Sequence, residues 1–202
     1  MRIAFIGDSL TEGWPGASYF EILRDRLPDH KLFNHGHGGD TVPALWSRLQ
    51  ASGLEPVDLA FVWVGVNDAF QAGWESYPDV PAEDDWWRAS VAHIAAVYDQ
   101  LLDWLSRRSP AVFCVPPLLP EGGVAASFER RVRHVAQAIV EVAVTRQVRA
   151  DPGLELLDLG PVFAAAREED PALRFTTDGV HLSERGAAVV AAAFAQAIAT
   201  LD

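Results

Sequence analysis

Two short polar motifs, one near each end of the chain, contain the residue types used in nucleophilic acyl transfer. Ser9 comes three residues after the apolar run Ile3–Ile6, so a serine hydroxyl is expected at the end of a strand. Asp178 lies three residues before His181. At this spacing a carboxylate can orient the imidazole through Nδ1 and leave Nε2 to take a proton from a serine hydroxyl. The three residues therefore match a nucleophile, a general base and its orienting acid.

Two further polar segments follow apolar runs in the same way. A glycine-rich segment, residues 34–41, comes after Leu32–Phe33, and Asn67 comes after Leu59–Val64. Glycine lets a backbone N–H approach a reacting oxygen without interference from Cβ, and an asparagine amide offers a second donor. Together with the N–H of Ser9, these groups could form an oxyanion hole.

Each motif also has a purely structural interpretation. Asp8 or Ser9 could cap the next helix, and Asp40 or Thr41 could cap another helix that has a proline in its first turn. The C-terminal Asp–His pair could belong to an ordinary surface loop. Ligands of open α/β sheets bind outside the carboxyl ends of the strands, however. Four motifs at that one edge favour the catalytic interpretation.

The elements that must position these residues are visible in the hydrophobic pattern. Short apolar runs bounded by Gly, Pro, Asn or Asp alternate with helix-period segments, which predicts a parallel α/β sheet. The five runs are Ile3–Ile6, Leu32–Phe33, Leu59–Val64, Val112–Val115 and Leu154–Leu157. Helices are predicted at about 91–105, 128–148 and 183–201. The basic residues of the second helix are expected on its outer face; they are Arg130, Arg131, Arg133 and Arg146.

Composition narrows the class of protein. A chain of 202 residues with 50% hydrophobic and 22% charged residues is typical of one globular domain. The net charge of -12 argues against nucleic acid and anionic membranes as partners. Cys114 is the single cysteine, and the apolar start of the chain is too short for a signal peptide. We expect a soluble, cytoplasmic protein without stable membrane insertion, unless a signal peptide precedes this sequence.

In their order and spacing the four motifs resemble the blocks of the SGNH (GDSL-type) hydrolase superfamily. The matching blocks are Gly7-Asp8-Ser9-Leu10, Gly39, Gly65-Val66-Asn67-Asp68 and Asp178-Gly179-Val180-His181. The resemblance implies that Ser9 is the nucleophile, His181 the general base and then acid, and Asp178 its orienting carboxylate. It also implies an oxyanion hole formed by the N–H groups of Ser9 and Gly39 and the side chain of Asn67.

The resemblance further implies the fold and the cofactor requirement. The family has a flavodoxin-like three-layer α/β/α sandwich with a five-stranded parallel sheet, and the five apolar runs agree with it. We expect one such domain over residues 1–202, with no metal and no organic cofactor.

The substrate side is less determined by the sequence. Residues 69–88 are predicted to form a Trp-rich loop insertion, longer than compact α/β folds usually contain. Four tryptophans are candidates for a wall or lid over the substrate: Trp14, Trp74, Trp86 and Trp87. Alternatively, they bury their large rings in the core or in an interface.

The expected function is hydrolysis of a small or short-chain acyl ester through an acyl-enzyme, with carbohydrate O-deacetylation as one option. The expected partners are the ester substrate and water. Thioesterase, lysophospholipase and acyltransferase activities use the same triad and remain alternatives. A non-catalytic binding domain of the same fold is an alternative from another class. A flavin or nucleotide binder is disfavoured because no P-loop or G-x-G-x-x-G motif follows any predicted strand.

Overall fold

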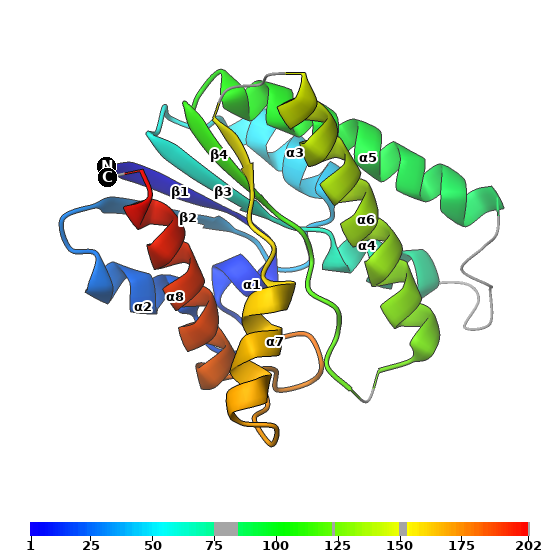
Figure 1. Cartoon of the computed structure of the whole chain (residues 1–202). Coiled ribbons are helices and arrows are strands. Elements are labelled where there is room, and N and C mark those ends of the chain that lie inside the picture. Colours follow the sequence, from blue (N-terminus) through cyan, green and yellow to red (C-terminus); the bar gives the residue numbers. More distant parts are fainter. Residues whose placement is uncertain (75–84, 123, 150–152, 202) are drawn as a thin grey trace.

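The computed structural model describes residues 1–74, 85–122, 124–149 and 153–201, and it shows helices on both faces of a parallel sheet (Figure 1). The strands are β1 (Arg2–Gly7), β2 (Lys31–Gly36), β3 (Leu59–Trp63), β4 (Ala111–Val115) and β5 (Leu154–Leu156). Their order in the sheet is β2-β1-β3-β4-β5. This flavodoxin-like order confirms the predicted fold class, and it reverses direction between β1 and β3.

All neighbouring strands are parallel, so their carboxyl ends lie at one edge. Ile3 pairs with Leu59 in the register of β1 and β3, and Val112 pairs with Leu154 in that of β4 and β5. Every residue of β3 is buried, as expected for a central strand that is covered on both faces. The polar residues that follow β1 and β3 therefore meet at the point where the strand order reverses.

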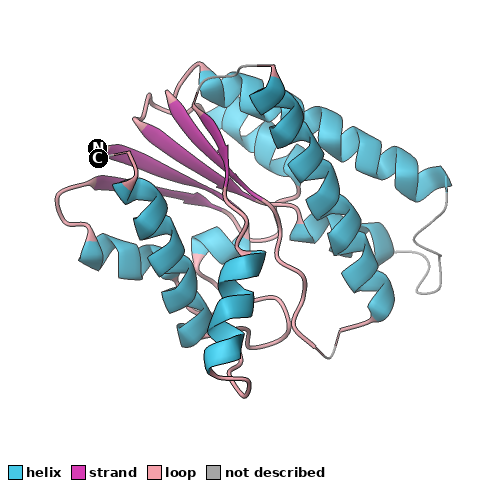
Figure 2. Ribbon diagram, in the orientation of Figure 1, coloured by secondary structure: helices cyan, strands magenta, loops and turns pink. Residues whose placement is uncertain are grey.

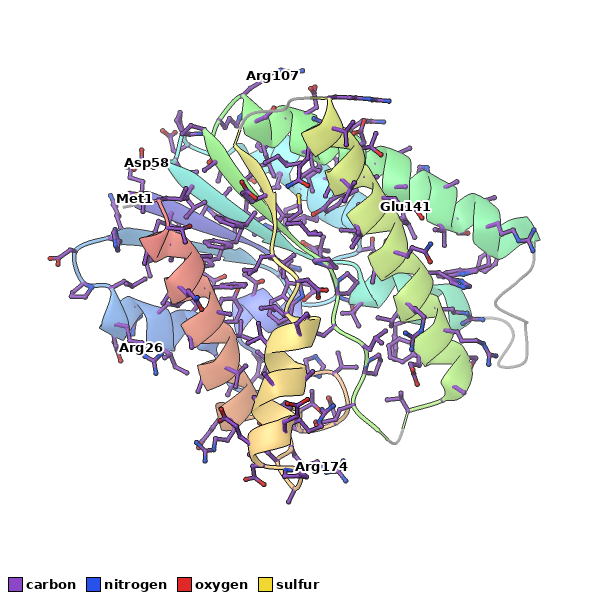
Figure 3. The ribbon with its side chains drawn as sticks, viewed as in Figure 1. Met1, Arg26, Asp58, Arg107, Glu141 and Arg174 are labelled. Atoms are coloured by element: carbon purple, nitrogen blue, oxygen red, sulfur yellow. The ribbon has the colours of Figure 1, made fainter. Side chains whose placement is uncertain are left out.

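Helices form the outer two layers (Figure 2). One face carries α1 (Ser9–Glu12), α2 (Tyr19–Arg26), α7 (Gly160–Glu169) and α8 (Glu184–Ala199), and the other carries α3 (Val42–Ser52), α4 (Val66–Trp74), α5 (Asp85–Ser106) and α6 (Ala126–Val148). Phe194 of α8 stacks on Phe61 of β3 at 4.7 Å between ring centroids, which seals the first face. Charged side chains such as Arg26 and Glu141 point outward (Figure 3). None of the described helices is both long and apolar enough to cross a membrane.

The three predicted helices are present as α5, α6 and α8, but one side chain of α6 lies on an unexpected side. The sequence predicted Arg131 on the outer, solvated face, and this is wrong, because Arg131 is only 6% exposed. Arg131 lies one helical turn before the buried Val135 and therefore shares its inward face. Its guanidinium lies over the ring of Trp87, 5.7 Å from the centroid.

The predicted Trp-rich loop at 69–88 is also corrected by the structure. Residues 69–74 belong to α4 and residues 85–88 belong to α5, so both ends of the segment are helical. Residues 75–84 lie outside the described part of the chain. The apolar period of α5 extends back to Trp87, which lies seven residues before the buried Ile94 and fourteen before Leu101. This period was not recognised in the sequence because prolines and acidic residues interrupt the apolar residues of the segment.

Candidate active site

Ser9 lies at the carboxyl edge of the sheet, at the junction of β1 and α1. The strand ends at Gly7, where a Cβ would lie 2.2 Å from the carbonyl oxygen of Trp63, so only glycine fits. Asp8 caps α1, because its Oδ1 accepts a hydrogen bond of 3.0 Å from the N–H of Leu10. The structure therefore confirms both predictions: Asp8 caps the helix, and Ser9 lies at the carboxyl edge of the sheet.

His181 and Asp178 extend from Ser9 as a hydrogen-bonded chain. His181 Nε2 lies 3.2 Å from Ser9 Oγ, and His181 Nδ1 lies 2.6 Å from Asp178 Oδ2. The second carboxylate oxygen of Asp178 accepts from the backbone N–H groups of Val180 at 2.9 Å and His181 at 2.8 Å. The side chain of Asp178 is thus held by its own turn while it faces the imidazole.

The environment of Asp178 favours its charged form. Burial works to raise the pKa of this carboxyl, but the hydrogen bonds from the His181 ring and from the two backbone N–H groups outweigh burial. The pKa of Asp178 therefore lies below its ordinary value. A charged carboxylate in this position can orient an imidazole and stabilise an imidazolium.

The glycine loop passes beside Ser9, and Asn67 is hydrogen-bonded to that loop. A Cβ added at Gly38 would come 3.9 Å from Ser9 Cβ, so this loop passes directly beside the serine. Gly39 has φ 82°, a left-handed conformation that favours glycine. Asn67 donates one N–H of its amide to the carbonyl oxygen of Asp40 at 3.0 Å. The bond turns the Asn67 amide to the loop, and an asparagine amide has a second N–H to offer to a reacting oxygen.

Other polar side chains hold this loop in place, and of these the sequence analysis did not name Arg48. Both carboxylate oxygens of Asp68 accept from the N–H of Val42, at 3.2 and 3.0 Å. Arg48 donates from Nε to Asp40 Oδ2 at 2.8 Å. Thr41 caps α3, as its structural interpretation predicted. The adjacency of Asp68 to Asn67 was a usable signal, whereas nothing local to Arg48 marks it.

Two of the acids beneath the site are deeply buried. Burial is the largest cause that raises the pKa of Asp8 to about 7; the N–H of Leu10 lowers it, and the charges of Asp68 and Asp40 raise it further. Burial likewise raises the pKa of Asp68 to about 7, against the hydrogen bond from Val42. The described part of the chain offers no hydrogen-bond partner to Oδ2 of Asp8. Both acids thus change protonation near neutral pH, and they lie next to the candidate site residues Ser9 and Asn67 in the sequence.

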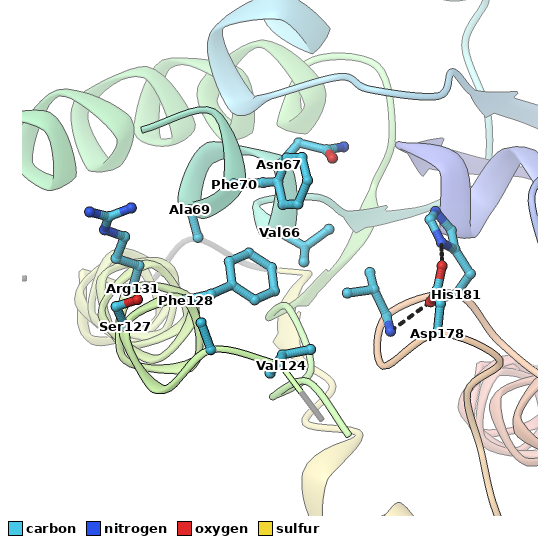
Figure 4. Close-up of a pocket in the computed structure, with 12 residues that line it drawn as sticks. Val66, Asn67, Ala69, Phe70, Val124, Ser127, Phe128, Arg131, Asp178 and His181 are labelled. Carbon is cyan, nitrogen blue, oxygen red and sulfur yellow. Dashed lines mark hydrogen bonds and ion pairs between the residues drawn. The ribbon is translucent and has the colours of Figure 1, made fainter. Parts of the chain in front are cut away.

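A cavity of about 470 Å³ opens from this constellation, between α4, α6 and the loop that carries His181 (Figure 4). Asn67, Asp178 and His181 form its polar end. Phe70 and Phe128 meet edge to face within it, 5.7 Å between ring centroids. Such a mixture of aromatic walls and a few convergent polar groups is typical of small-molecule sites.

Arg131 lines the same cavity, at the end opposite His181 (Figure 4). Sequence reasoning missed it because the basic residues of α6 look like a solvated face. In the described residues, no group of three or more His, Cys, Asp or Glu side chains is arranged to hold a metal ion.

Trp14, Trp86 and Trp87 do not line the cavity. Trp87 is 1% exposed, and its Nε1–H donates to Nδ1 of His134 at 2.9 Å. The prediction that it walls the substrate site is therefore wrong, and the alternative of a core residue is confirmed for it. Trp86 is 55% exposed and contacts Trp87, outside the lining of the cavity.

Trp14 lies close to the nucleophile. Its backbone N–H donates to the carbonyl oxygen of Ser9 at 3.3 Å, and its side chain is 73% exposed. The N–H of Ala17 donates to the carbonyl of Leu182, next to His181, so this segment runs along the site. Trp74 ends α4, and its side chain lies outside the described part of the structure.

The geometry supports acyl transfer through a serine. A base in contact with a hydroxyl, an acid that orients the base, and amide donors beside the hydroxyl are the parts that attack on an ester carbonyl requires. The sequence profile of the GDSL-like lipase/acylhydrolase family matches residues 5–189. The chain belongs to this family. A GDSL-like acylhydrolase is a carboxylic ester hydrolase, and no curated protein matches the sequence closely enough to narrow its activity.

Solved structures show how widely this family fold extends. The acetyl xylan esterase AlAXEase superposes with a TM-score of 0.76 at 21% identity, over 98% of this chain and 100% of the other. The lipase/acylhydrolase from Enterococcus faecalis gives 0.73 at 20% identity, over 98% and 94%. Axe2, an acetylxylan esterase from Geobacillus stearothermophilus, gives 0.72 at 18% identity, over 96% and 92%. At these identities the likeness shows the shared fold.

Proposed function

We propose that this acylhydrolase removes short acyl groups, acetyl above all, from carbohydrate esters, with Ser9 as nucleophile and His181 and Asp178 as its base and orienting acid. The N–H groups of Ser9 and Gly39 and the Asn67 amide hold the oxyanion. The observation that carries this assignment is the hydrogen-bonded chain from Ser9 Oγ through the imidazole to the carboxylate.

The chemistry follows from this arrangement. His181 Nε2 takes the proton of Ser9 as Oγ attacks the ester carbonyl, and Asp178 stabilises the imidazolium. The negative charge that develops on the carbonyl oxygen is met by the amide donors. His181 then gives its proton to the departing alcohol, which leaves an acyl-enzyme. Water, deprotonated by the same imidazole, releases the acid and restores Ser9.

The substrate class is inferred from what surrounds the serine. The cavity combines the aromatic rings of Phe70 and Phe128 with polar groups. Trp14 does not line it, but this residue is exposed and its backbone N–H bonds to the carbonyl of Ser9. Aromatic faces with nearby hydrogen-bonding groups suit a sugar ring, which has apolar C–H faces and polar edges. Two of the superposing structures are described as acetyl xylan esterases, which supports the same choice.

A series of p-nitrophenyl esters from acetate to decanoate tests the reaction, with the wild type and Ser9→Ala measured together. We expect activity that falls with chain length and disappears in the variant, along with labelling by a fluorophosphonate. Turnover of acyl-CoA substrates in preference to oxygen esters would favour a thioesterase instead. A wild type that neither hydrolyses nor becomes labelled would refute the catalytic assignment and favour a binding domain.

Acetylated xylo-oligosaccharides test the substrate class through Trp14→Ala, with Trp86→Ala as the matched exposed control. Loss of one aromatic platform should raise KM for the oligosaccharide about five- to tenfold, while kcat on p-nitrophenyl acetate stays close to that of the wild type. Trp86→Ala should change neither value. Equal effects of the two substitutions would remove Trp14 from the substrate site.

A further inference from the structure

Glu121, in the segment that follows β4, reaches across to the loop that carries His181. Its side chain is only 12% exposed. The carboxylate accepts from the backbone N–H of Phe175 at 3.0 Å, and from the N–H and hydroxyl of Thr176 at 2.9 and 2.7 Å. Arg167 of α7 donates to its other oxygen at 2.9 Å. One carboxylate thus satisfies four donors, from the loop and from a neighbouring helix.

The backbone of Glu121 makes a second connection to the same loop. Its N–H donates to the carbonyl oxygen of Gly179 at 2.8 Å. Gly179 is the residue directly after Asp178, so the loop is held at 175–176, before the acid, and again within the turn between Asp178 and His181. The two attachments bracket the carboxylate that orients the imidazole.

The charge of Glu121 suits this role. Burial works to raise its pKa, but the hydrogen bonds from Thr176, Arg167 and Phe175 outweigh burial and place the pKa of Glu121 below its ordinary value. Charge-assisted hydrogen bonds of this kind are roughly twice as strong as neutral ones. The carboxylate is therefore charged at neutral pH and accepts these hydrogen bonds as an anion.

A shift of this loop would move the imidazole relative to Ser9. The other contacts of this loop with the body of the protein include the N–H of Ala17, which donates to the carbonyl of Leu182, on the far side of His181. The Ser9 to His181 contact, at 3.2 Å, is at the long end for a hydrogen bond. A displacement of the imidazole by about 1 Å would break it, and misplacement of that size can cost about 100-fold in rate.

We propose that Glu121 is a positioning residue for the reaction, because its carboxylate ties the Phe175–Thr176 segment to the loop after β4 and so sets the Asp178–His181 pair against Ser9. This inference rests on the proposed triad.

The test compares Glu121→Ala and Glu121→Gln with Asp99→Asn. Asp99 forms a matched ion pair, 2.6 Å from Arg146, that joins α5 to α6 outside the cavity of the site. For each variant, kcat and KM on p-nitrophenyl acetate, the rate of fluorophosphonate labelling and the melting temperature are measured. Labelling requires the serine and its base but no bound alcohol group, so it reports on their alignment.

Glu121→Ala should lower kcat and the labelling rate together by about 100-fold, with KM within about threefold of the wild type. Glu121→Gln should lie between, because its amide oxygen still accepts from Thr176. Asp99→Asn should retain both rates. If Glu121→Ala does not fold, Glu121→Gln carries the same comparison.

Two results would overturn the proposal. One is a folded Glu121 variant with a lowered melting temperature but wild-type kcat and labelling rate, which is what a purely structural residue would give. The other is an equal loss of rate in Asp99→Asn. Ser9→Ala, included as a reference, separates the two levels of inference: if it still hydrolyses the ester, the triad itself is wrong; if it is inactive while Glu121→Ala is fast, only the positioning role is wrong.

Discussion

Replacing the buried Asp8 by asparagine should stabilise the protein at alkaline pH and destabilise it by about 1–3 kcal/mol at acid pH, where only the cost of the buried amide remains. Asp8 is 1% exposed, and only one of its oxygens, Oδ1, has a hydrogen-bond donor in the described part of the chain. Burial first of all, opposed by the N–H of Leu10 and reinforced by the charges of Asp68 and Asp40, raises its pKa from 3.8 to about 7. Ionisation of Asp8 therefore destabilises the folded state.

The sign of the effect follows from proton binding. Between pH 4 and 7 the folded chain keeps a proton on Asp8 that the unfolded chain has released, so the free energy of unfolding falls as pH rises through this window. Each pH unit is worth about 1.4 kcal/mol, which gives an upper bound of about 4 kcal/mol above pH 7. Asparagine keeps the Oδ1 acceptor for Leu10 but buries an amide N–H₂ at a cost of about 1–3 kcal/mol. The net gain expected at pH 8 is therefore on the order of 2 kcal/mol.

Urea unfolding of the wild type and Asp8→Asn at pH 4, 6 and 8 measures this difference. Asp25→Asn, an exposed acid on α2, is the matched control and should change the free energy of unfolding by less than about 0.5 kcal/mol at every pH. An effect of Asp8→Asn that is the same at pH 4 and pH 8 would refute the reasoning, because the pKa of Asp8 in the folded chain would then equal its value in the unfolded chain.

Three further predictions concern the site and its surroundings. Asn67→Ala should lower kcat by about 10²–10³ with little change in KM, because the proposed role of the amide is to bind charge that develops in the transition state; a large rise in KM instead would indicate a substrate-binding role. Asp178→Asn should lower kcat by about 10⁴ on ester substrates at unchanged melting temperature, and a variant with near wild-type turnover would contradict its orienting role. Trp87→Phe should lower the free energy of unfolding by about 1–3 kcal/mol in urea titrations, because it loses the bond to His134 and buried volume, while KM stays constant; a changed KM would return Trp87 to the substrate site.

Much of the fold was predictable because its signals are local. The apolar runs and the helix periods each depend on residues within one element, and they indicated the five strands and three of the helices. The edge position of Ser9 was equally predictable, because a motif that directly follows a strand of a parallel sheet must lie at its carboxyl end. The structure places Ser9, His181 and Asp178 in one hydrogen-bonded chain, and the variants described above test their roles.

Other features were not predictable from patterns of this kind. Trp87 looked like part of a loop because Pro78 and Pro81 precede it, yet it completes the buried face of α5. Arg131 looked solvated, yet its helix turns it inward against Trp87. A helical pattern shows that one face is apolar, but it does not show which polar residue at the margin of that face a neighbouring element will cover.

The sequence by itself determined the five strands, three of the helices and the chemical groups available at the sheet edge, because hydrophobic period and motif spacing are properties of contiguous residues. Only the tertiary structure showed that Glu121 is hydrogen-bonded to the loop of His181, and that Asp68 and Arg48 form hydrogen bonds to the glycine loop. These contacts join residues that are 20 or more positions apart or lie on different elements, as with the 54 positions between Glu121 and Phe175. Which of the many possible partners meet is set by how the helices pack on the sheet, and no local pattern records that choice.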